Sequence, residues 1–148
     1  MPESLIEFVT EDIEFTLINQ NEITDWLNQI ISQHGYQLEN LTYVFCSDEY
    51  LHNMNLEYLN HDTYTDIITF DNADQSGVIE SDIFISIDRV KENAQQLGTS
   101  FPDELHRVMI HGVLHLLGFD DKTPELKAQM QQEEDRSLKA RKFSTEGI

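Results

Sequence analysis

Two histidines, His111 and His115, stand four residues apart in a segment whose other residues are mostly apolar. Side chains at this spacing lie one above the other on one helix face, about 5–6 Å apart between their Cβ atoms. Two neutral imidazoles in that arrangement can bind one divalent metal ion, and zinc accepts imidazole nitrogen at about 2.0–2.1 Å. A single buried histidine is more often a hydrogen-bonded core residue, so the interpretation needs support from neighbouring residues.

The residues after the pair supply that support. Gly118 follows His115 by three positions, and a glycine can adopt the left-handed conformation that ends a helix and turns the chain back. Asp121 follows three positions later, next to Asp120. The spacing His-x3-His-x2-Gly-x2-Asp is typical of the long zincin motif, in which a third ligand returns below the helix. We therefore predict that His111, His115 and Asp121 bind a metal ion, and that Asp120 orients a ligand or the turn.

Position 112 indicates what such a metal would do. Zinc peptidases of this spacing carry a glutamate directly after the first histidine, where it acts as general base, but this chain has Gly112. Glu104 lies two helical turns before His111, and we expect it at the mouth of the helix. A peptidase interpretation therefore loses its main support, whereas the metal alone can still polarise a phosphoryl oxygen and lower the pKa of bound water.

The predicted elements that position these residues are alternating strands and helices in the first part of the chain and helices alone in the last part. N-caps are predicted at Ser47, Ser100 and Thr123, and the strands over 67–70 and 83–87 are close enough to pair as an antiparallel hairpin. The pattern favours an α+β domain in which the histidines lie on a buried central helix. Alternation and helical spacing predict strands over 11–17, 41–46, 67–70 and 83–87, and helices over 23–35, 47–58, 88–97, 101–117 and 123–142.

The composition narrows the class of protein. The chain has 148 residues, 39% of them hydrophobic, which suits one globular domain. Its 28 acidic and 9 basic residues give a formal charge of −19, and residues 1–88 contain no Lys or Arg, which argues against broad electrostatic capture of nucleic acid. A single cysteine, Cys46, excludes an intrachain disulfide framework. Without a basic leader or a long apolar segment, we expect a soluble, cytoplasmic protein.

Three segments carry a resemblance to a known family. Residues 111–121, HGVLHLLGFDD, resemble the signature HGxLHLxGYDH of the YbeY family of rRNA-maturation endoribonucleases. Residues 65–70, TDIITF, resemble that family's TDVLSF, and residues 81–86, SDIFIS, resemble its GDIVIS strand. The resemblance covers about residues 41–140 with the same order and spacing, which makes it specific.

The resemblance implies a fold and an activity. The expected fold is a single zincin-like domain over residues 1–148, with a mixed four-stranded sheet and about five helices. The implied activity is a zinc-dependent, single-strand-specific endoribonuclease that matures the 3′ end of small-subunit rRNA and acts in ribosome quality control. One Zn²⁺ per chain is expected, with Fe²⁺ or Ni²⁺ as alternatives. The expected partners of this monomer are single-stranded rRNA and the small ribosomal subunit with its proteins, and no membrane.

Two positions depart from the family pattern. Asp121 stands where the family has a histidine, and an anionic ligand should reduce the Lewis acidity of the ion and move the site toward the two-His-one-carboxylate triad of iron enzymes. Leu59 stands where an arginine aligns in a segment resembling FRGxDxPTD, so a guanidinium that could stabilise the transition state is missing. Asn60, His61 or Arg107 could replace it.

We also expect catalytic roles near the second motif. Thr65 and Asp66, together with His61, are candidate catalytic residues, and Thr69 should line the cleft. The alternative for His61 is an exposed loop histidine without a role. Two other functions stay open at this point: a non-catalytic, metal-binding ribosome assembly factor, or another zinc hydrolase such as a peptidase or amidase.

Overall fold

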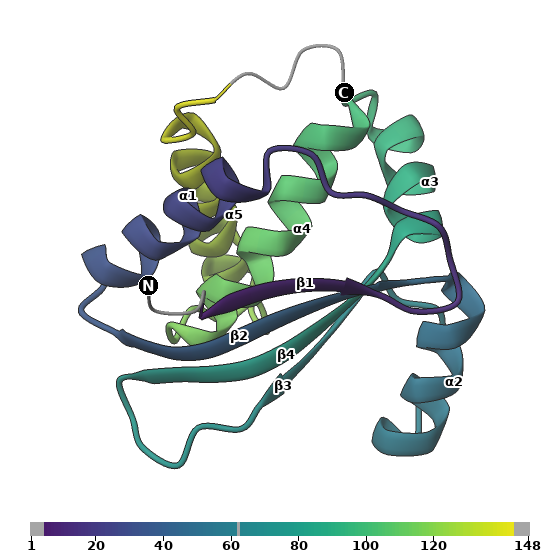
Figure 1. Ribbon diagram of the computed structural model, residues 1–148, viewed down its shortest axis with the longest axis horizontal. Helices are drawn as coiled ribbons and strands as arrows, with labels where there is room; N and C mark the ends of the chain where they lie inside the picture. Colours follow the sequence, from purple (N-terminus) through teal and green to yellow (C-terminus); the bar gives the residue numbers. More distant parts are fainter. Residues whose placement is uncertain (1–4, 62, 144–148) are drawn as a thin grey trace.

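The computed structural model describes residues 5–61 and 63–143. Within these ranges the chain forms five helices and four strands, as the sequence and the resemblance predict (Figure 1). The elements in chain order are β1 (Ile6–Thr10), α1 (Gln20–Gln33), β2 (Gln37–Cys46), α2 (Asp48–Leu59), β3 (Ile67–Asp71), β4 (Val78–Ser86), α3 (Ile87–Leu97), α4 (Phe101–Leu116) and α5 (Pro124–Lys139).

The four strands form one mixed sheet in the order β1-β2-β4-β3. Strands β1, β2 and β4 run parallel, whereas β3 pairs antiparallel with β4, placing Thr69 opposite Ile83. The hairpin predicted for residues 67–70 and 83–87 is therefore confirmed. Because β3 is an edge strand, its outer side is free to border a cavity.

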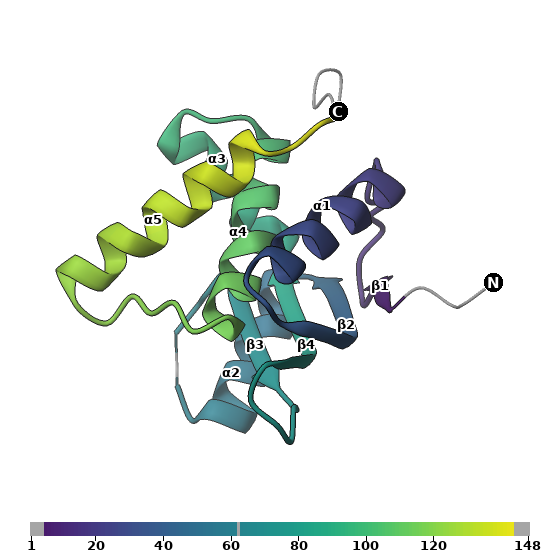
Figure 2. The ribbon, with the colours of Figure 1, turned by 90° about the vertical axis from the view of Figure 1, so that its left-hand side faces the viewer.

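Helices cover the two faces of the sheet unequally. Helices α1, α4 and α5 lie over one face, and α2 lies on the other (Figures 1 and 2). Alternate residues of β2, Leu41, Tyr43 and Phe45, belong to the main core, which α1 and α4 complete. On the opposite face Cys46 and Ile68 form a smaller core with Leu51 of α2. None of the helices in the described ranges is long and apolar enough to cross a bilayer.

Helix α4 is buried on nearly all sides, as its apolar sequence predicts. The predicted N-cap is confirmed, since the Ser100 hydroxyl accepts a hydrogen bond from the Asp103 backbone N–H at 3.2 Å. The Tyr43 hydroxyl donates to the Met109 carbonyl at 2.9 Å, a direct link from β2 to the middle of the helix. These contacts fix the helix that carries the two histidines.

The predicted strand over residues 11–17 is wrong. The first strand ends at Thr10, and the chain leaves the sheet at Asp12, whose φ of 44° does not fit a strand. The Asp12 carboxylate instead accepts hydrogen bonds from the backbone N–H and hydroxyl of Ser47. Phe15 and Leu17 still point into the core, so their alternation reports burial of an extended segment that has no partner strand.

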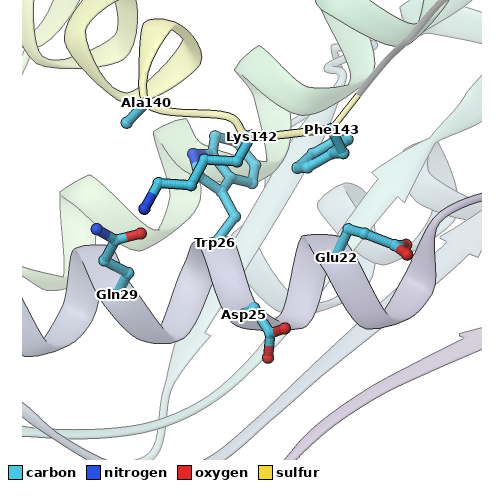
Figure 3. Close-up of a pocket in the computed structure, with 7 residues that line it drawn as sticks. All are labelled: Glu22, Asp25, Trp26, Gln29, Ala140, Lys142 and Phe143. Atoms are coloured by element: carbon cyan, nitrogen blue, oxygen red, sulfur yellow. The ribbon is translucent and has the colours of Figure 1, made fainter.

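The C-terminal segment is anchored against α1. The Trp26 indole N–H donates to the Ser137 carbonyl at 2.7 Å, and the Trp26 ring meets Phe143 edge-on. Figure 3 shows the small cavity of about 170 Å³ that remains between α1 and this segment, with Lys142 extending across it. None of the residues that line this cavity belongs to the histidine motif.

His106 makes this anchor sensitive to acid. Its ring is 2% exposed and Arg141 donates to its Nδ1 at 2.8 Å, while Arg141 also binds Asp103. Burial, followed by the nearby Arg141 charge, lowers the pKa of His106 from 6.5 to about 4. The fold therefore favours the neutral ring over the protonated one.

The stability of the protein should consequently fall between pH 6.5 and 4. In that window the unfolded chain binds a proton at residue 106 and the folded chain does not, which costs about 3 kcal/mol in total and nothing above pH 6.5. In His106→Gln, which keeps an acceptor for Arg141, this part of the loss should disappear. Urea unfolding at pH 7 and pH 4.5 measures it, and equal losses in both proteins would contradict the assignment.

Candidate metal centre

The two histidines lie on the last turns of α4, at its C-terminal end. His115 is exposed, and the His111 side chain is 29% exposed. Gly118, at a φ of 102°, ends the helix as predicted, and the Phe119 N–H donates back to the Leu114 carbonyl at 3.0 Å. The glycine therefore performs the chain reversal that the spacing required.

The reversal brings Asp121 to His111. The Asp121 Oδ2 lies 3.7 Å from the His111 Nε2. Asp120 holds the turn instead, because its Oδ1 accepts hydrogen bonds from the backbone N–H groups of Asp121 and Lys122. This supports the prediction that Asp120 orients the turn, and it leaves the Asp121 carboxylate as the one that faces His111.

A carboxylate from α5 fixes the orientation of the His111 ring. Glu134 is 6% exposed, and its Oε2 accepts a hydrogen bond from the His111 Nδ1 at 2.7 Å. Its other oxygen accepts from Arg107 at 2.9 Å, and Arg107 also binds Asp135. Because a carboxylate can only accept, Nδ1 carries a proton, and Nε2 is the ring nitrogen that faces Asp121.

Sequence reasoning missed Glu134. A signal was nevertheless present, because Glu134 stands between Met130 and Ser137 on the buried stripe of α5, where a charged residue needs a partner. The hydrogen bond to Glu134 is also the main reason that the pKa of His111 is raised, against the opposing effect of burial. The arrangement matches the carboxylate–histidine pairs that orient ligands in metalloproteins.

Gly112 faces the sheet and not the histidines' cavity. A Cβ at this position would lie 3.0 Å from the Cδ1 atoms of Ile67 and Ile83. The glycine therefore allows α4 to approach β3 and β4 closely. A general base at position 112 has no room here, which explains in structural terms why the peptidase interpretation lacks support.

Most of the predicted site residues line one cavity. It has a volume of about 320 Å³ and lies between the end of α4, strand β3 and the loop before it. Asp66 is the exception, because it lines a neighbouring cavity that shares only Ile67, His111 and Asp121 with the first. The lining residues of the first cavity are Asn55, Leu59, His61, Thr63, Thr65, Ile67, Ile68, Thr69, His111, His115 and Asp121.

Asn55 holds the loop that carries three of these side chains. Its amide, 3% exposed, donates to the Thr63 carbonyl at 2.9 Å and to the Thr63 hydroxyl at 3.1 Å. Its backbone carbonyl accepts from the His61 N–H at 3.1 Å. The loop therefore places His61 and Thr65 opposite the helix end. Of the proposed replacements for the missing arginine, His61 lines this cavity, and Arg107 lines the neighbouring one.

The donors present suit a divalent metal ion. Zinc and iron accept imidazole nitrogen and carboxylate oxygen as ligands. The cavity offers both, from His111, the facing Asp121 and His115. Among residues 5–61 and 63–143, however, no three His, Cys, Asp or Glu side chains already stand together as a formed metal cluster. The residue types fit a bound metal, and the ligand set stays a prediction.

Comparison with known proteins agrees with the resemblance in the sequence. The family model described as Endoribonuclease YbeY matches residues 6–142. The chain is 54% identical over 143 residues to Endoribonuclease YbeY of Cytophaga hutchinsonii, covering 97% of this chain and 100% of that protein. It is 49% identical over 134 residues to Endoribonuclease YbeY of Amoebophilus asiaticus, covering 90% and 91% of the two chains.

A solved structure agrees in fold. The solution structure of a Thermotoga maritima protein superimposes with a TM-score of 0.63 at 22% identity, covering 97% of this chain and 99% of that one. At this identity the likeness concerns the fold alone. The family model and the two relatives carry the assignment further, and they show that the chain belongs to the Endoribonuclease YbeY family.

Proposed function

We propose that this protein is a zinc-dependent endoribonuclease that cleaves single-stranded ribosomal RNA during maturation of the small-subunit rRNA 3′ end and in ribosome quality control. Membership of the Endoribonuclease YbeY family supports the nuclease activity. The observation that carries the proposal is the position of the His111 ring. Its Nδ1 donates to Glu134, and its Nε2 faces Asp121 on the wall of an open cavity.

His111, His115 and Asp121 would hold the Zn²⁺, with Fe²⁺ or Ni²⁺ as alternative ions. When bound, the metal supplies a Lewis acid for a phosphoryl oxygen and lowers the pKa of a bound water. The protein's own contribution is to fix the ligands before the substrate arrives. Glu134 keeps His111 in the ligating tautomer, and the Asp120 turn holds the backbone of Asp121.

The opposite wall of the cavity would position the RNA backbone. His61, Thr63 and Thr69 offer hydrogen-bond donors to phosphate and ribose oxygens. The Thr65 hydroxyl donates to the Ile67 carbonyl at 3.3 Å, so in this conformation it offers an acceptor to ribose hydroxyls. Asp66 lines the neighbouring cavity, and burial is the main reason that the pKa of its carboxyl is raised.

Cleavage of defined RNAs tests the proposal. A single-stranded RNA that contains the 3′ end of small-subunit rRNA should be cut, and the same sequence in a duplex should not. Chelator should stop the reaction and Zn²⁺ should restore it. Failure to cut any RNA, together with metal-dependent co-sedimentation with small ribosomal subunits, would favour the non-catalytic assembly factor. We also propose a cytoplasmic location and a monomeric state, which cell fractionation and analytical sedimentation test.

The variant Asp121→His restores the ligand that the family pattern has. We expect it to keep the metal and to cleave RNA at least as fast as the wild type, because a neutral imidazole leaves the ion a stronger Lewis acid than a carboxylate does. Metal content by mass spectrometry and the initial cleavage rate measure both effects. Loss of the metal in this variant would show that Asp121 is not the ligand, and Asp120→Ala should then be measured.

A further inference from the structure

A second cavity adjoins the proposed cleavage site and is lined mainly by acidic side chains. It has a volume of about 290 Å³ and lies between the first turns of α4, the start of β3 and α5. It meets the first cavity at His111, Asp121 and Ile67. Its further lining residues are Asp66, Glu104, Arg107, Val108 and Glu134.

Glu104 in this cavity has an acceptor atom without a partner. The residue is 5% exposed, and its Oε1 is a buried atom that no described residue hydrogen-bonds. A buried carboxylate oxygen without a hydrogen-bond donor is destabilising, so the site suits a ligand that brings a donor. Burial, followed by the charges of Asp66 and Glu134, raises the pKa of Glu104.

The charges around Glu104 select the kind of ligand. Asp66, Glu104 and Glu134 line the cavity together, and the guanidinium of Arg107 is already engaged by Glu134 and Asp135. A phosphate would be repelled here. A neutral group with N–H donors satisfies the free oxygen without that repulsion.

Distance decides between a catalytic and a recognition role for Glu104. It precedes His111 by seven residues on the same helix face, which separates the two by about 10 Å along the axis. A general base must come within about 3 Å of the proton that it removes, or reach it through one water. A separation of this size suits contact with the base of a nucleotide whose phosphate lies near His111.

We propose that the second cavity is a nucleobase subsite in which Glu104 accepts a hydrogen bond from the exocyclic amino group of a base next to the cleaved phosphate. The inference rests on the proposed endoribonuclease function, because RNA supplies the base. Proteins read unpaired RNA bases through these edges, and carboxylates accept from amino groups such as that of cytosine. Cytosine, adenine and guanine carry such an amino group and uracil does not, so the subsite should disfavour uridine.

Titration of single nucleotides, followed by NMR, tests the subsite without requiring cleavage. Cytidine, adenosine and guanosine monophosphates should shift the backbone amide signals of residues 104–108, with dissociation constants about tenfold lower than that of uridine monophosphate. Purine riboside monophosphate and inosine monophosphate, which lack the amino group, should bind like uridine monophosphate. Equal binding of adenosine and purine riboside monophosphates and of guanosine and inosine monophosphates would overturn the proposal. The absence of shifts at these residues with any nucleotide would overturn it too.

The variant Glu104→Gln probes the acceptor directly. Its amide presents N–H donors as well as an oxygen, so the roughly tenfold discrimination against uridine monophosphate should disappear. Glu125→Gln, a change at an exposed position of α5, is the matched control and should keep it. The dispersion of the same spectra reports folding. RNA cleavage by the wild type is scored separately: cleavage without base discrimination would overturn the subsite alone, and discrimination without cleavage would overturn the proposed function alone.

Discussion

Replacing His115 with alanine should remove the metal ion and lower the rate of RNA cleavage by more than about a hundredfold. Changes to groups that merely orient a ligand typically cost ten- to a hundredfold, and loss of a ligand itself should cost more. His115 is exposed, so the fold should survive the change and the effect should be confined to the site. Mass spectrometry of protein purified without chelator measures the metal, and initial rates on single-stranded RNA measure the activity.

The matched control for this result is Glu134→Gln. The amide can still accept from the His111 Nδ1 through its oxygen but loses the charge, so metal affinity should fall only about ten- to a hundredfold. The order wild type, Glu134→Gln, His115→Ala in metal content is therefore expected. Equal metal content in wild type and His115→Ala would show that His115 is not a ligand.

The second large effect is expected at Gly112. The variant Gly112→Glu should lower the free energy of unfolding by more than about 4 kcal/mol, because overpacking against Ile67 and Ile83 adds to the cost of burying a carboxylate there. It should not create a peptidase, although it restores the residue that follows the first histidine in zinc peptidases. Urea unfolding followed by circular dichroism measures the stability, and cleavage of casein tests the activity.

Gly112→Ala separates the two contributions. It adds the crowded Cβ without the charge, and the better helix propensity of alanine, worth about 1 kcal/mol, offsets part of the overpacking cost of about 1–3 kcal/mol. A small change is therefore expected. An unchanged stability of Gly112→Glu, or a gain of peptidase activity, would mean that position 112 points into the cavity and not at the sheet.

Local chemistry explains which parts of the fold were predictable. The caps at Ser47, Ser100 and Thr123 depend on hydrogen bonds within a few residues, and all three are confirmed. The strand over 11–17 was wrong because alternation reports which side chains are buried and not whether a neighbouring strand is available. At Asp12 the chain instead turns away to bind Ser47, a contact across 35 positions that no local pattern contains.

The same distinction applies to the site. The two histidines, Gly118 and Asp121 lie within eleven residues, so their spacing encodes their approach, and the distance from His111 to Asp121 agrees with it. Glu134 reaches His111 from another helix, 23 positions away, and Glu104 becomes an unsatisfied acceptor only when its neighbours exclude water. Both depend on how α4 packs against the rest of the molecule, which the sequence does not state.

The Glu134 carboxylate couples the packing of α5 on α4 to the orientation of His111 in the proposed metal centre. Its two oxygens join α5 to both Arg107 and His111 of α4. If α5 detaches, His111 loses its fixed tautomer, and an ion bound at His111 favours the attached helix by mass action. Amide hydrogen exchange in α5 should therefore slow when the metal binds, even though α5 supplies no ligand. The attachment of α5 and the occupancy of the proposed metal centre should therefore change together, and the rate at which α5 opens would report how much metal is bound.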